Sequence, residues 1–286
     1  MTRRLIDIGD TRVVTVDCND STDKAIALME EHDIHHLPVT DGGHLVGMLS
    51  ESDLMQSVGW LPQRDRIGGG HAPGYVGPTQ VAQIASAPVV TLPASAGIEE
   101  AIRAMLEHDI HAIPLSTNER PAGIVSRLDL LKLYVDDHFR VTRPAWRFAK
   151  VRDHMLAHVY SLGPNDTLAA AMRLMRHKRI RHVPVVQDDR LIGIVSDRDI
   201  RLAIGRAAVD AGTAEANHID VPLDDHLSEV MNAEVVTIEP AATLAEAAQR
   251  MIDRRISTLP VMLEERMIGI LTEDDLLRVL AASLDA

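Results

Sequence analysis

The sequence is poor in cysteine, aromatic residues and long apolar runs, and each shortage excludes a class of protein. Cys18 is the only cysteine among 286 residues, so no disulfide can form within the chain. This usage is typical of a reducing compartment, and we expect the cytoplasm. Aromatic side chains make up 2% of the chain, too few for the stacking platforms that bind single-stranded nucleic acids. No apolar run approaches the roughly 18 residues of a spanning helix, so we expect no membrane insertion.

Positive charge is also scarce. The formal net charge is −13, with 29 basic against 42 acidic residues. Such a surface repels phosphate backbones, and we therefore expect no nucleic-acid partner. A local anion site remains compatible with this charge. No apolar stretch follows the basic residues 1–4, so a signal peptide is not expected.

What the chain does contain is an internal repeat. Four prolines separated by 76, 70 and 76 residues mark it: Pro38, Pro114, Pro184 and Pro260. Nine residues after each proline stands a glycine: Gly47, Gly123, Gly193 and Gly269. Isoleucine, methionine and alanine recur at fixed positions before each proline. Repeated columns of this kind indicate one structural unit present in four copies.

Each copy reads as the same order of elements. In the last copy, the β-branched run 235–238 predicts a strand, and Thr243 with Glu246 predicts a capping box that opens a helix. Two short apolar runs separated by a turn at 263–266 predict a hairpin, and a second helix should begin near Thr272. A short apolar-patterned helix precedes each unit. The unit is therefore βαββα, and the fold class is α+β.

One such unit is too small to bury its own sheet, so the units should pack in pairs. The proline spacing favours two modules, 1–135 and 150–283, joined by a linker at 136–149. Within them we expect units at 1–58, 81–135, 150–204 and 226–283. Glycine and proline in the gap after residue 58 predict a flexible connection.

These columns resemble the cystathionine β-synthase (CBS) domain, most clearly in the segments 180–185 (IRHVPV) and 193–199 (GIVSDRD). The resemblance covers nearly the whole chain apart from the connectors. It implies four CBS units paired into two Bateman modules. Bateman modules commonly bind AMP, ADP, ATP, S-adenosylmethionine or related adenosyl ligands between their two units, and they regulate a partner.

The main site candidate is a Ser/Thr-x-x-Asp element at the start of each second helix. A helix N-terminus presents unpaired N–H groups that suit phosphate, and the hydroxyl can add a hydrogen bond. The hydroxyls are Ser50, Ser126, Ser196 and Thr272. By the resemblance, the carboxylates should hold ribose: Asp53, Asp129, Asp199 and Asp275. The competing interpretation is that both residues only cap the helix.

Basic residues nearby are candidates for contacting phosphate. The position three before each proline carries His35, His111, Arg181 or Ser257, and Arg127 and Arg198 follow the hydroxyls of units 2 and 3. The alternative is a surface cation beside a strand. His36 and His182 should face the opposite way. Because Glu51, Glu273 and Asp274 add negative charge to units 1 and 4, we expect anions to favour Asp129 and Asp199, with Asp275 the weakest.

The glycine column has two open interpretations, close approach to adenine or close packing of a strand. No nucleophile elbow, P-loop or zinc-protease motif occurs, so we expect no enzyme and no required cofactor.

The sequence thus predicts a non-catalytic sensor of adenine nucleotides, or of an S-adenosylmethionine-like ligand, that changes its module geometry and acts on an unknown regulated protein. A homodimer is an option. The alternative is a metal-responsive or purely structural partner-binding protein, because His32, His35 and His36 cluster and His154 and His158 stand four apart.

Overall fold

A computed structural model describes residues 4–58, 80–135, 148–210 and 223–284. Unit 1 contains η1 (Leu5–Asp7), β1 (Val16–Asp17), α1 (Thr22–His32), β2 (His36–Asp41), β3 (His44–Ser50) and α2 (Glu51–Val58). Unit 2 contains η3 (Val81–Gln83), β4 (Leu92–Pro93), α3 (Ile98–Glu107), β5 (Ala112–Thr117), β6 (Arg120–Ser126) and α4 (Arg127–Val135). The repeat predicted from the proline columns is thus present in the fold.

The second half of the chain repeats this order. Unit 3 contains α5 (Val151–His154), α6 (Leu168–Lys178), β7 (His182–Gln187), β8 (Arg190–Ser196) and α7 (Asp197–Asp210). Unit 4 contains α8 (Leu227–Val230), α9 (Leu244–Arg254), β9 (Thr258–Leu263), β10 (Arg266–Thr272) and α10 (Glu273–Leu284). The Thr243–Glu246 capping box that opens α9 is confirmed, as is the start of α10.

The first strand of each unit is shorter than predicted. Units 1 and 2 keep two-residue strands, and in units 3 and 4 the strand is reduced to single parallel bridges, Leu162 to Val185 and Ile238 to Val261. In all four units the segment before this strand pairs with the other unit of the pair; in unit 4, Asn232 bridges Ile194 on β8 of unit 3. The run predicted as a strand at 235–238 is therefore mostly a crossing between two sheets.

These crossings confirm that unit 1 pairs with unit 2 and unit 3 with unit 4. The segment after each short leading helix adds a bridge to the last strand of the other unit in the pair. The bridges are Asp10 to Ile124, Met48 to Ser86, Leu156 to Ile270 and Ile194 to Asn232. Each unit thus completes the sheet edge of its partner, so neither is a closed structure alone.

The repeated glycines leave room for the segment that crosses from the other unit of each pair. A Cβ built at Gly193 would stand 2.4 Å from the sulfur of Met231, and one at Gly269 would stand 2.6 Å from that of Met155. At Gly47 the nearest atom would be the carbonyl oxygen of Ser86 at 3.1 Å. Of the two interpretations left open by the sequence, close packing between chain segments is the one the structure supports.

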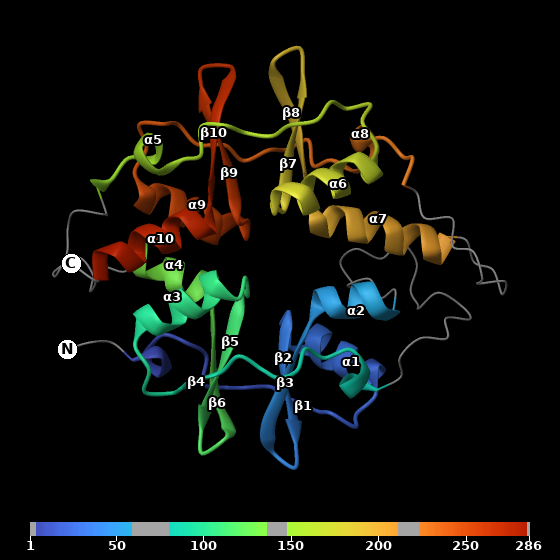
Figure 1. The fold of residues 1–286 in the computed structure, drawn as a ribbon, viewed down its shortest axis with the longest axis vertical. Helices are drawn as coiled ribbons and strands as arrows, with labels where there is room; N and C mark the ends of the chain where they lie inside the picture. The colour runs from blue at the N-terminus through green and yellow to red at the C-terminus, as the bar shows by residue number, and fades with distance from the viewer. Residues whose placement is uncertain (1–3, 59–79, 136–147, 211–222, 285–286) are drawn as a thin grey trace.

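The four units form a flattened body in which the hairpins point outward and α2, α4, α7 and α10 face the middle (Figure 1). One continuous apolar core joins units 2 and 4 and includes Leu131, Tyr134, Leu276 and Leu280. Units 1 and 3 instead have separate cores, which meet where Leu202 of α7 joins the core of unit 1. A continuous apolar core therefore joins the two modules on one side only, between units 2 and 4.

Candidate functional site

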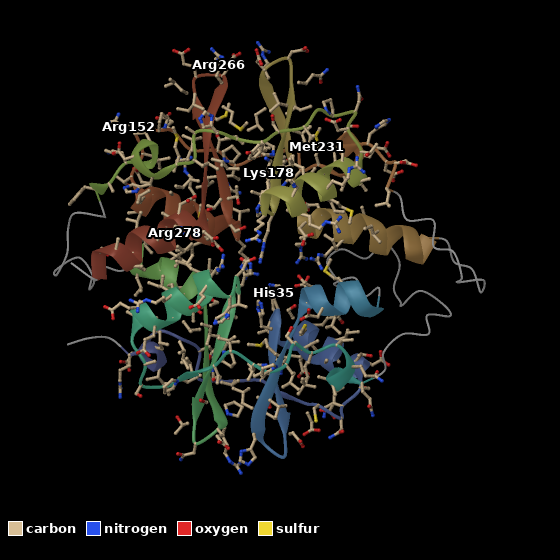
Figure 2. The ribbon with its side chains drawn as sticks, in the orientation of Figure 1. His35, Arg152, Lys178, Met231, Arg266 and Arg278 are labelled. Atoms are coloured by element: carbon tan, nitrogen blue, oxygen red, sulfur yellow. The ribbon has the colours of Figure 1, made fainter. Side chains whose placement is uncertain are left out.

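A cavity of about 420 Å³ lies where the four units meet. Unit 3 contributes Ser196, Asp199 and Arg181, and unit 4 contributes the crossing segment at Val235 and Val236. Units 1 and 2 add His35, His36, Ser50, Glu51, Ser52 and His111. Figure 2 places His35 near the middle of the body, between the two modules. The cavity thus has an apolar wall from one unit and polar groups from all four.

The Ser-x-x-Asp element of unit 3 lies at this cavity because β8 ends and α7 begins there. Asp199 Oδ2 accepts hydrogen bonds from the Ser196 backbone N–H at 2.8 Å and from the Ser196 hydroxyl at 2.6 Å. The Asp199 N–H donates back to the Ser196 hydroxyl at 3.1 Å. One carboxylate oxygen therefore caps the helix. Among the described residues, no donor is assigned to Oδ1, which remains available to a ribose.

All four copies form this same reciprocal cap, with hydroxyl-to-carboxylate distances of 2.6, 2.6, 2.6 and 2.7 Å. The capping interpretation and the binding interpretation are therefore compatible, because they use different oxygens. The copies differ in their second oxygen. Lys132 donates to Asp129 Oδ1 at 2.8 Å, so that oxygen already has a cation. In unit 4, burial raises the pKa of Asp275. Neither residue lines the cavity.

The basic residues predicted to contact phosphate divide into two groups. His35, His111, Arg181 and Arg198 line the cavity. Arg127 does not: it is 5% exposed and donates to the carbonyl oxygens of Ile110 and Met105 and to Asp274. Arg127 therefore lies in the buried interface between units 2 and 4 and not at the cavity, where contact with phosphate was expected.

Two histidines are placed differently from the sequence prediction. His36 and His182 were expected to face away, yet both line the cavity. His182 lies within hydrogen-bonding distance of Thr258 Oγ1 and Ser257 Oγ of unit 4, at 3.0 and 3.3 Å. Burial lowers the pKa of His36 and of His182 to about 4, so both rings are neutral near pH 7. They offer hydrogen bonds rather than charge.

The arginines of the cavity are already paired with carboxylates, a feature that the sequence did not reveal. Arg198 Nη1 lies 2.7 Å from Glu51 Oε1, and Arg181 Nη2 lies 2.7 Å from Asp109 Oδ2. Arg255 Nη1 lies 3.3 Å from Asp33 Oδ2. In each pair the arginine belongs to module 2 and the carboxylate to module 1.

The signal that could have located two of these pairs is the end of each first helix. Asp33, Asp109, Arg179 and Arg255 stand five residues before their prolines, and three of them take part in the pairs. All but Asp109 are C-caps in the left-handed conformation, and Asp109 also has a positive φ of 51°. Non-glycine residues adopt this conformation uncommonly. This conformation recurs at the three residues of the set that pair across the modules, Asp33, Asp109 and Arg255.

The family model for the CBS domain matches residues 5–59, 81–136, 151–206 and 227–282. The chain belongs to the CBS domain family. Its four CBS domains form two Bateman modules, in agreement with the resemblance seen in the sequence.

Several known proteins resemble this CBS chain along its length. Protein MJ1225 of Methanocaldococcus jannaschii, proposed as an archaeal homologue of γ-AMPK, is 26% identical over 94% of this chain and 96% of its own. Its crystal structure superposes with a TM-score of 0.74 at 24% identity, covering 97% of this chain and all of that one. The 33.4 kDa protein in the ribosomal RNA operon of Thermofilum pendens is 28% identical over 88% of this chain and 82% of its own.

A shorter CBS domain pair, that of protein MJ0100, was crystallised with 5′-methylthioadenosine and S-adenosyl-L-methionine. It matches 47% of this chain and 98% of its own at 21% identity, with a TM-score of 0.38. The ligands are a property of that protein.

Neither a metal-ligating cluster nor a membrane-spanning helix is found among the described residues. Over residues 4–58, 80–135, 148–210 and 223–284, no group of three or more histidine, cysteine, aspartate or glutamate side chains is arranged to hold a metal ion. No helix in those same ranges combines the length and the apolar character that a membrane span requires.

Proposed function

We propose that the central cavity binds an adenosyl ligand and that the chain is a non-catalytic sensor in which the bound state alters the contact between modules. The observation that carries the proposal is the position of Ser196 and Asp199 at the N-terminus of α7, on the wall of a cavity shared by both modules. The other groups required by an adenosine compound surround this point.

Three parts of such a ligand find matching chemistry. Asp199 Oδ1 can accept both hydroxyls of a ribose. Val235, Val236 and Ile256 offer apolar surface for a purine ring, and the exposed polar groups of that segment can bond the ring edge. The 5′ group would lie toward Glu51 and Arg198, which line the cavity and pair with each other.

The regulatory part of the proposal rests on which units line the cavity. A ligand there touches four units and both modules, so binding and module docking share residues such as Glu51 and Arg198. Sites that share residues in this way are coupled in free energy. The protein on which the sensor acts, its location in the cytoplasm and a homodimer stay predictions from the sequence.

A thermal-shift screen of the full chain tests the proposal. Adenosine, 5′-methylthioadenosine, AMP, ADP, ATP and S-adenosylmethionine are compared with guanosine and GMP at equal concentrations. Adenine compounds should raise Tm by mass action while guanine compounds do not. Asp199→Asn should abolish that shift, whereas Asp129→Asn, a matched change outside the cavity, should leave it. No shift with any adenine compound contradicts the proposal.

A further inference from the structure

Glu51 occupies the place that the sequence assigned to a ligand phosphate. Its side chain is 6% exposed, and its two oxygens are divided between two units. Oε2 lies 2.5 Å from His35 Nδ1 of unit 1, and Oε1 lies 2.7 Å from Arg198 Nη1 of unit 3. His35 and Arg198 are two of the basic residues that line the cavity as candidates for phosphate.

Asp109 has a similar arrangement on the other side of the cavity. Its Oδ2 accepts a hydrogen bond from Arg181 Nη2 at 2.7 Å, and its Oδ1 lies 3.5 Å from Arg127 Nη2. Arg181 also contacts His111. Two protein carboxylates from module 1 thus bind two of the three arginines that line the cavity from module 2, Arg181 and Arg198.

We propose that Glu51 and Asp109 are built-in counter-anions that determine specificity: they select adenosyl ligands with an uncharged or cationic 5′ group against those with a 5′-phosphate. This inference rests on the proposed function of the same cavity. A phosphate can reach Arg198 or Arg181 only by displacing a carboxylate or by lying beside it. Displacement breaks a charge-assisted bond, and proximity adds like-charge repulsion.

The charge of the surrounding side chains supports this selection. Asp197, Asp199 and Glu234 also line the cavity, and each adds negative charge. The ring of His111 does not compensate for this charge, because burial lowers its pKa to about 3, with Arg127 and Arg181 lowering it further. A 5′-thioether or a sulfonium needs none of the arginines, so the carboxylates do not oppose it.

Glu51 and Asp109 differ in burial, and this difference determines how strongly each is expected to affect ligand specificity. Glu51 is almost completely buried, while Asp109 is 65% exposed and its charge is screened by water. The larger effect on specificity therefore belongs to Glu51.

The experiment compares the affinity for AMP and for 5′-methylthioadenosine by calorimetry on the full chain. Wild type should bind 5′-methylthioadenosine more tightly than AMP. Glu51→Gln keeps the shape and hydrogen bonding of the side chain but removes its charge. It should raise AMP affinity by about tenfold while changing 5′-methylthioadenosine affinity by less than about twofold. Asp129→Asn is the control, because it also removes one carboxylate charge, at a residue that lies outside the cavity lining and pairs with Lys132 on its own helix.

Asp109→Asn keeps the inference testable if Glu51→Gln fails to fold. Asparagine tolerates the positive φ of this position, so only the charge changes. AMP affinity should rise about threefold, with little change for 5′-methylthioadenosine. An unchanged ratio of the two affinities in the variants overturns the inference while leaving the proposed function intact. If neither compound binds wild type, the proposed function fails and this inference fails with it.

Discussion

Between units 2 and 4, α4 of module 1 packs against α9 and α10 of module 2 in one apolar core. Tyr134 of α4 is 1% exposed, and its hydroxyl donates across the interface to the carbonyl oxygen of Leu276. Between units 1 and 3, α2 meets α7 through the Glu51–Arg198 pair and through Leu202, which packs into the core of unit 1. The same two module faces are thus joined by apolar packing on one side and by charge on the other.

The difference can be traced to one position in the second helix. Leu131 and Leu277 stand seventeen residues after their prolines and are fully buried. The matching residue in unit 3 is Arg201, which pairs with Asp197 on its own helix. A charged side chain there prevents a second continuous core. The proposed sensor function would gain from this arrangement, because the cavity borders the side that can change without unfolding the apolar core between units 2 and 4.

The largest expected effect is the loss of Tyr134. Tyr134→Ala should lower the free energy of unfolding by about 3–5 kcal/mol, because a large buried side chain leaves a cavity in the shared core. Leu202→Ala, on the other side, should cost about 2 kcal/mol, at the low end for leucine, because its surroundings are partly open. Urea denaturation of both variants measures the comparison. Equal losses would show that the two sides are equally sealed.

Acid should weaken the cavity side. Burial holds the pKa of His36 and His182 near 4 and that of His111 near 3, well below the value of an unfolded chain. The unfolded chain therefore binds more protons below about pH 6.5, and stability should fall from there to about pH 4, by on the order of 3 kcal/mol for each of these histidines. His182→Gln should flatten this slope in denaturation at several pH values.

The opposite pH dependence is expected from Glu273 of unit 4. Burial raises the pKa of Glu273 to about 7, so the folded chain keeps a proton that the unfolded chain releases above about pH 4.5. This contribution to stability is present at low pH and is lost as pH rises through 7. Glu273→Gln should therefore make the acid loss steeper. If neither His182→Gln nor Glu273→Gln changed the slope of stability against pH, these buried groups would not be the source of the pH dependence.

The pair across the open side should show a measurable coupling. A double-mutant cycle of Glu51→Gln and Arg198→Met should give about 1–1.5 kcal/mol, because the carboxylate is buried and its bond is charge-assisted. The control cycle, Asp197→Asn and Arg201→Met, tests an exposed pair within α7 and should give about 0.3–0.5 kcal/mol. Similar coupling in both cycles would mean that the charge contact between modules has no special strength.

The repeat made the architecture predictable. Fixed columns of proline, glycine and aspartate gave the βαββα unit, its number and its pairing, because each column reflects a local demand such as a cap or a close approach. The Ser196–Asp199 element was also visible, since its spacing is that of one helical turn. The sequence could not show which elements face the same cavity, because this depends on contacts between distant units.

The residues whose surroundings differ from the sequence prediction are also placed by contacts between distant units. Arg127 has the same chemistry as Arg198, yet it is buried between units 2 and 4, because the interface on that side closes over it. His36 and His182 were expected to face away, but each is paired in its hairpin with the residue that ends the second strand, Ser50 or Ser196, which also lines the cavity. Glu51 was read as a repulsive charge, and its pairing with Arg198 comes from the other module.

The smallest expected effect is on the exposed ion pair between Asp33 of unit 1 and Arg255 of unit 4. Both side chains are largely exposed, at 65% and 71%, so water screens their charges and ordering them costs entropy. Asp33→Asn should change the free energy of unfolding by less than about 0.5 kcal/mol, since asparagine accepts the positive φ of 50° at this position. Urea denaturation at low and at high salt measures it. A loss above about 1 kcal/mol that disappears in salt would show that exposed charges, and not the buried Glu51 alone, hold the two modules together.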